Sequence, residues 1–142
     1  MKMIVVSHGG FAKGIVESVQ MLSGPQEDLK AFGLMPEQTV NDLTDELEEE
    51  LKSTPADQEV LFCTDLYHGS PFNAVVSLMR DYKFEHLTGI NLPLLLDMVL
   101  SRYSGKSAAQ MCEDAARQAG DTVMNVSQLF QNAECDGDEE ED

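Results

Sequence analysis

A histidine followed by two glycines, His8-Gly9-Gly10, stands directly after a short apolar run near the start of the chain. Imidazole is a good phosphoryl acceptor, because one ring nitrogen can attack phosphorus while the other donates a hydrogen bond to a carboxylate. The two glycines would let backbone amides approach a phosphoryl group, and a helix that begins soon afterwards would favour its negative charge. A single histidine after a strand is more often structural, so this interpretation depends on what surrounds it.

A second group of polar residues lies between Asp65 and Ser70, after another apolar run. If Asp65 reaches His8, its carboxylate would fix the ring tautomer and stabilise positive charge on the ring; otherwise it caps a turn. Ser70, which precedes a proline, has the pattern of a helix N-cap. Its hydroxyl and the amides near Gly69 could also bind phosphoryl oxygens. His68 is either a second acid or base or an exposed loop residue.

Short apolar runs alternate with amphipathic helical patterns along the chain. Strands are predicted at residues 2–7, 29–34, 59–64 and 86–90, and helices at 11–22, 40–51, 70–79, 91–102 and 107–120. A last short strand is predicted at 125–130. The pattern predicts an α/β fold: a doubly wound, mainly parallel sheet of about four strands with helices on both faces. Such sheets bind ligands at the carboxyl ends of their strands, where His8 and Asp65 lie.

Two details of this assignment can be tested directly against a structure. The third helix is predicted to bury one stripe, made of Phe72, Val75, Val76 and Met79. His86, at the start of the fourth strand, is predicted to be a surface residue.

The 142 residues are enough for one domain with a substantial core, and the formal net charge is −17. Residues 133–142 hold seven acids and no base; without them 19 acids and nine bases remain, a charge of −10. Nucleic acid is therefore excluded as a partner, because phosphate contacts need clustered Lys and Arg. The acidity fits a basic protein partner or serves solubility alone. We expect a domain at residues 1–130 and an acidic, disordered tail at 131–142.

The compartment is predicted from what the sequence lacks. No run of ~18 apolar residues is present, and the first apolar stretch is too short for a signal peptide. The three cysteines are an odd number without metal-like spacing, which favours reduced thiols. We expect a cytoplasmic protein that needs no metal and no cofactor.

Three segments together are more specific than any single residue. They are Val6-Ser7-His8-Gly9-Gly10-Phe11-Ala12-Lys13-Gly14, Asp65-Leu66-Tyr67-His68-Gly69-Ser70-Pro71-Phe72-Asn73 and Gly89-Ile90-Asn91-Leu92-Pro93-Leu94-Leu95-Leu96. Over about residues 1–130, the sequence resembles the enzyme IIA component of the mannose class of the bacterial sugar phosphotransferase system. Many relatives have Gly where His68 stands and Trp or a similar residue where Tyr67 stands, which leaves the local loop chemistry open.

The resemblance implies a phosphocarrier. His8 would accept phosphate from the general carrier HPr and give it to a IIB protein, which serves a IIC/IID membrane permease. Asp65 would bond to the ring of His8, Ser70 would lie near the phosphate, and Gly9, Gly10 and Gly69 would form the phosphoryl-binding loops. In the family a C-terminal strand is exchanged between subunits, so the resemblance implies a homodimer built with residues 125–130. Some relatives continue into a IIB domain, whereas this chain ends in acidic residues, so we expect a separate IIA subunit; the resemblance leaves the sugar open.

The same residues bear on four rival interpretations. A phosphoglycerate-mutase-like enzyme needs an Arg before its histidine, and position 7 is Ser. A response-regulator receiver would use Asp65 as acceptor but needs acids after its first strand, which Ser7-His8-Gly9 does not supply. The phosphoryl-donor subunit of a dihydroxyacetone kinase system is the closest alternative, although its loop usually lacks the Gly-Ser-Pro-Phe-Asn run. A non-catalytic binding module would not require this set of residues.

Overall fold

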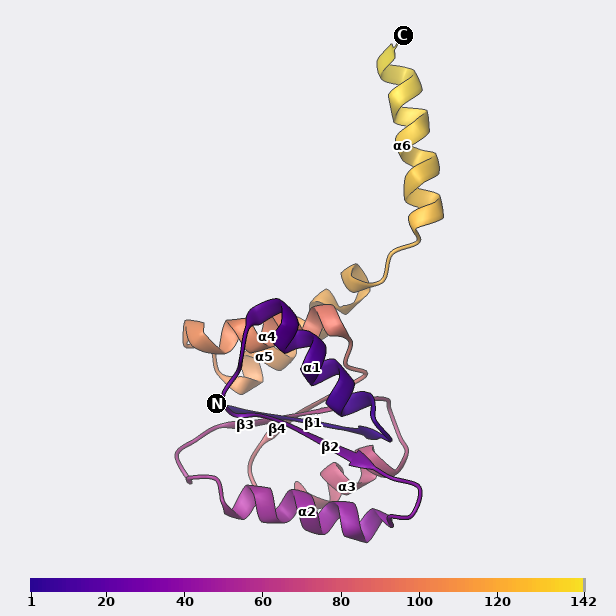
Figure 1. Cartoon of the computed structure of the whole chain (residues 1–142). Coiled ribbons are helices and arrows are strands. Elements are labelled where there is room, and N and C mark those ends of the chain that lie inside the picture. The colour runs from indigo at the N-terminus through magenta and orange to yellow at the C-terminus, as the bar shows by residue number, and fades with distance from the viewer. Residues whose placement is uncertain (142) are drawn as a thin grey trace.

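Four parallel strands form a sheet at the centre of the molecule (Figure 1). They are β1 (Lys2–His8), β2 (Leu29–Leu34), β3 (Val60–Thr64) and β4 (Glu85–Thr88), in the order β2-β1-β3-β4. The computed structural model describes residues 1–141, with side chains through residue 134. The predicted α/β class with an all-parallel sheet of four strands is confirmed.

The inner strands β1 and β3 are buried on both faces, which explains their nearly continuous apolar sequences. Successive side chains of a strand point to opposite faces, so β1 contributes to two separate cores. Met3 and Val5 join one core, whereas Ile4 and Val6 join the other.

Helices cover both faces of the sheet (Figure 1). The first core is closed by α1 (Phe11–Ser23), α4 (Leu92–Ser101) and α5 (Ala108–Gln118), and the second by α2 (Val40–Lys52) and α3 (Ser70–Leu78). Short 3₁₀ turns, η1 (Arg102–Ser104) and η2 (Ala119–Thr122), follow α4 and α5. Among the described residues, no helix is both long and apolar enough to cross a membrane.

The order of the strands places two distant segments at one point. The chain passes from β1 to β2 on one side and later returns to β3 on the other side of β1. The parallel register sets Val6 opposite Thr64, so the carboxyl ends of β1 and β3 lie next to each other. In doubly wound sheets this reversal opens the crevice in which ligands bind.

Helix α3 differs from its prediction in two respects. Its N-cap is Gly69, and Ser70 is already the first helical residue, so the predicted N-cap at Ser70 is wrong by one position. Ala74 and Leu78 face the core together with Val75, whereas Val76 and Met79 are 40% and 47% exposed. The apolar spacing of this short helix fits two neighbouring stripes, and the small side chain of Ala74 lets the helix approach the sheet.

The predicted C-terminal strand at 125–130 is wrong in this structure: helix α6 (Val126–Glu141) occupies that segment and projects from the body (Figure 1). A strand needs a neighbouring edge for its hydrogen bonds, whereas a helix forms them within its own segment. Residues 127–134 are rich in Gln, Asn, Ala and Glu rather than in β-branched types, which favours the helix. The predicted boundary at residue 130 falls inside α6, and the division into domain and tail stays a prediction; Asp142 lies outside the described residues.

Candidate functional site

His8 and Asp65 meet at the carboxyl edge of the sheet, although they are 57 residues apart in the chain. One carboxylate oxygen of Asp65, Oδ2, lies 2.8 Å from His8 Nδ1 and accepts a hydrogen bond of 2.9 Å from the His8 backbone amide. These two contacts hold the ring with Nδ1 as the donor. No hydrogen bond to Nε2 is formed by any described residue, and the His8 side chain is 49% exposed. The ring therefore presents Nε2 to an incoming group.

Asp65 is ionised in this arrangement. Burial alone would raise the pKa of its carboxyl group, but the hydrogen bonds from the His8 amide and ring outweigh it and hold the pKa below its usual value. The amide of Leu66 also donates to Asp65 Oδ1, at 3.0 Å. The ionised carboxylate can stabilise positive charge that develops on the His8 ring.

Gly69 packs against the His8 ring and begins α3. A Cβ added at Gly69 would lie 3.2 Å from His8 Cε1 and 3.5 Å from Nε2, and the backbone has φ +96°, a region that favours glycine. No side chain caps α3 at this end, and Ser70 follows in its first turn. The start of α3 at Gly69 therefore lies beside Cε1 and Nε2 of the His8 ring.

The start of α1 follows His8 directly in the chain. Its N-cap is Gly10, which carries no side chain to cap the helix, and Gly9 turns the chain with φ +51°. The Gly9 amide donates to the Leu34 carbonyl at 2.9 Å, which ties the turn to the end of β2. The structure thus brings together His8, Asp65 and both glycine turns that the sequence analysis selected.

Comparisons with known proteins agree with this geometry. Residues 2–117 match the family model EIIA-man, described as "PTS system fructose IIA component". The chain is 32% identical over 100 residues to the "PTS system fructose-specific EIIA component" of Bacillus subtilis, covering 70% of this chain and 68% of that protein. It is 28% identical over 100 residues to the "PTS system mannose-specific EIIAB component" of Escherichia coli, covering 70% of this chain but 31% of that protein.

The crystal structure of phosphotransferase system component EIIA from Streptococcus agalactiae has a similar fold. It superposes with a TM-score of 0.81 at 29% sequence identity, covering 89% of this chain and 98% of that chain.

The chain belongs to the EIIA-man family. As a mannose-class EIIA protein of the sugar phosphotransferase system, it has a transferase role in sugar transport. The recognition from three short segments is confirmed. The aligned residues span about a third of the E. coli EIIAB protein.

In this EIIA-man chain, the loop after Asp65 carries an aromatic cluster. The rings of Tyr67 and His68 lie 3.8 Å apart between centroids, and each also contacts Phe72, at 5.3 and 5.7 Å. His68 adopts φ +66°, an uncommon value for a residue other than glycine. Of the two possibilities that the sequence left for His68, the structure shows the exposed loop residue, with its ring packed on aromatic neighbours.

His86 is not the surface residue that the sequence predicted. It lies within β4 and is half-buried. Its Nε2 is 2.8 Å from Thr64 Oγ1, and the Thr64 hydroxyl donates its proton to Thr88 Oγ1. Burial lowers the pKa of His86 to about 4, so the ring is neutral near pH 7. His86 therefore belongs to the packing beneath the site, not to the exposed edge.

Two residues near His8 were missed by the sequence analysis. Gly33 in β2 lies so close to the turn that an added Cβ would sit 2.1 Å from the Gly9 carbonyl oxygen. Ser7 is fully buried, and its hydroxyl contacts the same turn. Two signals in the sequence were available: Gly33 is a small residue near the end of a strand, and Ser7 is a polar residue that follows an apolar run.

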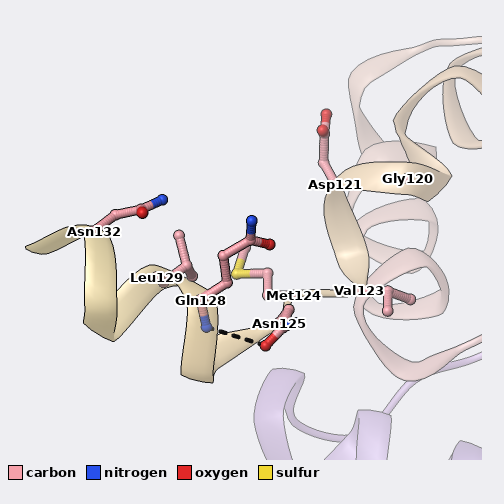
Figure 2. A pocket seen from close by; sticks show the side chains of 8 residues that line it. All are labelled: Gly120, Asp121, Val123, Met124, Asn125, Gln128, Leu129 and Asn132. Atoms are coloured by element: carbon pink, nitrogen blue, oxygen red, sulfur yellow. Dashed lines mark hydrogen bonds between the residues drawn. The ribbon is translucent and has the colours of Figure 1, made fainter.

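Within the described residues, no three His, Cys, Asp or Glu side chains gather as a metal site. A hollow of about 430 Å³ lies at the start of α6 and shares no lining residue with the site around His8. Figure 2 shows Met124, Gln128 and Leu129 at this hollow, where the Gln128 amide donates to Asn125 Oδ1 at 3.1 Å.

Proposed function

We propose that His8 is the phosphoryl acceptor of a cytoplasmic phosphocarrier and that Nε2 is the attacking atom. The observation that supports this most is the pair of contacts from Asp65 Oδ2 to the ring Nδ1 and the His8 amide, 2.8 and 2.9 Å. With the proton held on Nδ1, the lone pair on Nε2 points outward. A nitrogen that keeps its lone pair free while the other donates to a carboxylate is the form suited to nucleophilic attack.

In the proposed step, Nε2 of His8 attacks the phosphorus of a phosphohistidine on the donor protein. The new Nε2–P bond forms as the bond between phosphorus and the donor nitrogen breaks, and the donor ring leaves with that electron pair. The proton on Nδ1 stays in place, so the phosphorylated ring carries positive charge beside the ionised Asp65. Transfer onward is the same step in reverse, with an acceptor on the next protein.

The glycine turns and helix starts would hold the phosphoryl oxygens. Gly10 and Gly69 have no side chain that could accept from the first amides of α1 and α3; at α1 the Ala12 amide donates to Ser7 Oγ, while those of Gly10 and Phe11 donate to no described residue. Each helix N-terminus typically contributes about 0.3–1 kcal/mol to binding of a negative charge. The Ser70 hydroxyl, in the first turn of α3, makes no hydrogen bond with any described residue and would add one more donor.

We infer that the partners dock on a set of exposed apolar side chains around His8, here called the apolar rim. Its members are Phe11, Met35, Leu66 and Tyr67, which are 46%, 41%, 50% and 65% exposed. They follow the ends of β1, β2 and β3, at the same edge as His8. Exposed apolar groups around a polar centre are typical of protein interfaces. HPr as donor and a IIB protein as acceptor, serving a IIC/IID permease, are the partners that the family suggests.

We also propose a homodimer that uses the C-terminal segment. The exposed apolar residues there are Val123, Met124, Val126, Leu129 and Phe130. The segment contacts little of its own chain in Figure 1, so its apolar surface is available to a second copy. Chains that end at Met124 should be monomeric or insoluble by light scattering, and chains that lack only residues 133–142 should remain dimeric. A monomeric full-length protein would contradict the dimer.

The phosphoryl acceptor can be tested by labelling. Incubation with phosphoenolpyruvate, enzyme I and HPr should raise the intact mass by one phosphate, and His8→Ala should abolish this rise. His68→Ala, a matched change of an exposed histidine in the adjacent loop, should still be labelled. Label retained in His8→Ala would refute the assignment.

A further inference from the structure

The side chain of Ser7 is a buried polar group that directly follows the apolar residues Met3 to Val6 of β1. Ser7 has no exposed surface, and Met3 and Val5, which precede it at alternate positions, belong to the core under α1. A valine at position 7 would continue that pattern. A buried hydroxyl lowers stability unless it is hydrogen-bonded, so its presence calls for a specific set of partners.

The Ser7 hydroxyl has such partners, and all belong to the turn after His8 or to the start of α1. Ser7 Oγ accepts a hydrogen bond of 2.7 Å from the Ala12 amide, and its proton is directed at the carbonyls of His8 and Gly9, at 3.1 and 3.4 Å. Ala12 is the second residue of α1, whose own N-cap, Gly10, has no side chain. Ser7 therefore caps α1 from the preceding strand.

This cap leaves other amides free. Those of Gly10 and Phe11, at the start of α1, donate to no described residue. Because Ser7 takes the Ala12 amide and bonds to the Gly9 carbonyl, it fixes the direction of the peptide groups between them. The Gly9 amide is held separately by the Leu34 carbonyl, so Ser7 supplies the link from the turn to the helix.

We propose that Ser7 is a positioning residue for phosphoryl transfer: its buried hydroxyl holds the Gly9-Gly10 turn and the start of α1 so that the free amides face a phosphoryl group on His8 Nε2. This inference rests on the proposed function of His8. Amides that are fixed before the reaction stabilise developing charge without reorganisation, and a displacement of about 1 Å can reduce a rate by ~10²-fold.

The test compares Ser7→Ala with Ser107→Ala. Ser107 also caps a helix, since its hydroxyl accepts a hydrogen bond of 3.1 Å from the Gln110 amide at the start of α5. Transfer from phosphorylated HPr would be followed over a range of donor concentrations. Ser7→Ala should lower the rate constant at saturating donor by about 10- to 100-fold and leave the half-saturating concentration unchanged. Ser107→Ala should leave both unchanged, and Ser7→Thr, which retains the hydroxyl, should recover most of the rate.

A second measurement does not require phosphorylation. Hydrogen exchange of the Ala12 amide, which loses its acceptor, should become faster in Ser7→Ala and remain as in the wild type in Ser107→Ala. If Ser7→Ala does not fold, Ser7→Cys, which keeps the volume but bonds weakly, should show the same loss of rate.

The outcomes separate this inference from the proposed function. A labelled wild type together with a folded Ser7→Ala or Ser7→Cys variant that transfers at the wild-type rate overturns the role of Ser7 alone. If Ser7→Ala leaves the rate constant at saturating donor unchanged but raises the half-saturating donor concentration, the role of Ser7 is also overturned, because that result indicates weaker docking. A wild type that HPr does not label removes the proposed function and this inference with it.

Discussion

The helices that cover the sheet begin in two different ways. α2, α4 and α5 start after Thr39, Asn91 and Ser107, whose side chains each accept a hydrogen bond from an amide of the first turn. α1 and α3 start after Gly10 and Gly69, which have no side chain to do so; at α1, Ser7 of the preceding strand accepts from the Ala12 amide, but the amides of Gly10 and Phe11 donate to no described residue. Because the first amides of a helix have no partner within it, the first group is completed by its own caps, and the second has donors available for a ligand.

The difference follows the position of each helix relative to His8. α1 and α3 come directly after β1 and β3, the two strands whose ends carry His8 and Asp65. At α5, by contrast, the carboxylate of Glu59 accepts a hydrogen bond of 3.3 Å from the Ala108 amide, so a negative side chain already occupies that helix start. We therefore expect a helix N-terminus to bind the phosphoryl group here only where the N-cap residue itself has no side chain.

Asp65→Asn, at the carboxyl edge of the sheet, should have the largest effect on the rate of phosphoryl transfer. Asn keeps the shape of the side chain but loses the charge that balances a phosphorylated His8 ring. Orienting and charge-stabilising groups of this kind typically contribute ~10²–10⁴-fold in rate, and we expect transfer from HPr to slow by that range. Quenched-flow labelling would measure it, with Asp97→Asn, on the exposed side of α4, as the control. Transfer at the wild-type rate would show that Asp65 is only a loop cap.

Gly10→Asp should convert α1 from the open kind of helix start to the capped kind. The backbone at Gly10 has φ −87°, and an added Cβ meets nothing within 4 Å, so the side chain fits without strain. The carboxylate should stabilise the fold by a few tenths to about 1 kcal/mol, and repel the phosphoryl group, slowing transfer about 10- to 100-fold. Gly10→Asn, which caps without charge, should slow it less. A Gly10→Asp variant with unchanged transfer would contradict the role of the open helix start.

Thr39→Ala tests the capped kind in the opposite direction. Thr39 Oγ1 accepts a hydrogen bond of 3.1 Å from the Asp42 amide, and Asp42 Oδ2 accepts one of 2.9 Å from the Thr39 amide. Removing this cap should lower the free energy of unfolding by about 1 kcal/mol, as measured by urea denaturation, without changing the rate of phosphoryl transfer. A slower transfer in this variant would show that caps away from His8 also influence the site.

The effect expected at His86 concerns the dependence of stability on pH and leaves phosphoryl transfer unchanged. The folded protein holds the pKa of His86 at about 4, whereas the unfolded chain binds the proton from about pH 6.5 downward. Stability should therefore fall as the pH decreases through that window. In His86→Gln, the difference in unfolding free energy between about pH 7 and about pH 5 should be smaller than in the wild type. His68→Gln, at an exposed histidine, serves as the control. If the unfolding free energy of His86→Gln differs between the two pH values as much as that of the wild type, this account is refuted.

Local patterns in the sequence were enough for much of the fold and part of the site. Residues 2–7 and 59–64 are apolar runs of strand length, and Asn91 and Ser107, which are residue types that favour helix N-caps, are the N-caps of α4 and α5. His8 and Asp65 could be selected because each follows such a run. These features depend on residues that are close in the chain, which is why periodicity and capping residues indicate them.

Other features depended on which segments meet in space. The contact of Asp65 with His8 requires β1 and β3 to be neighbours in register, and the need for glycine at position 33 arises only because the Gly9 carbonyl approaches it. The same holds for Ser7, whose hydroxyl acquires its role from the turn and the helix that fold over it. The segment 126–130 shows the converse, because a single chain provides no strand edge there and its backbone forms helical hydrogen bonds instead. The sequence by itself determined the elements and the candidate residues, while the tertiary structure decided their partners, since a hydrogen bond between distant residues depends on strand order and register.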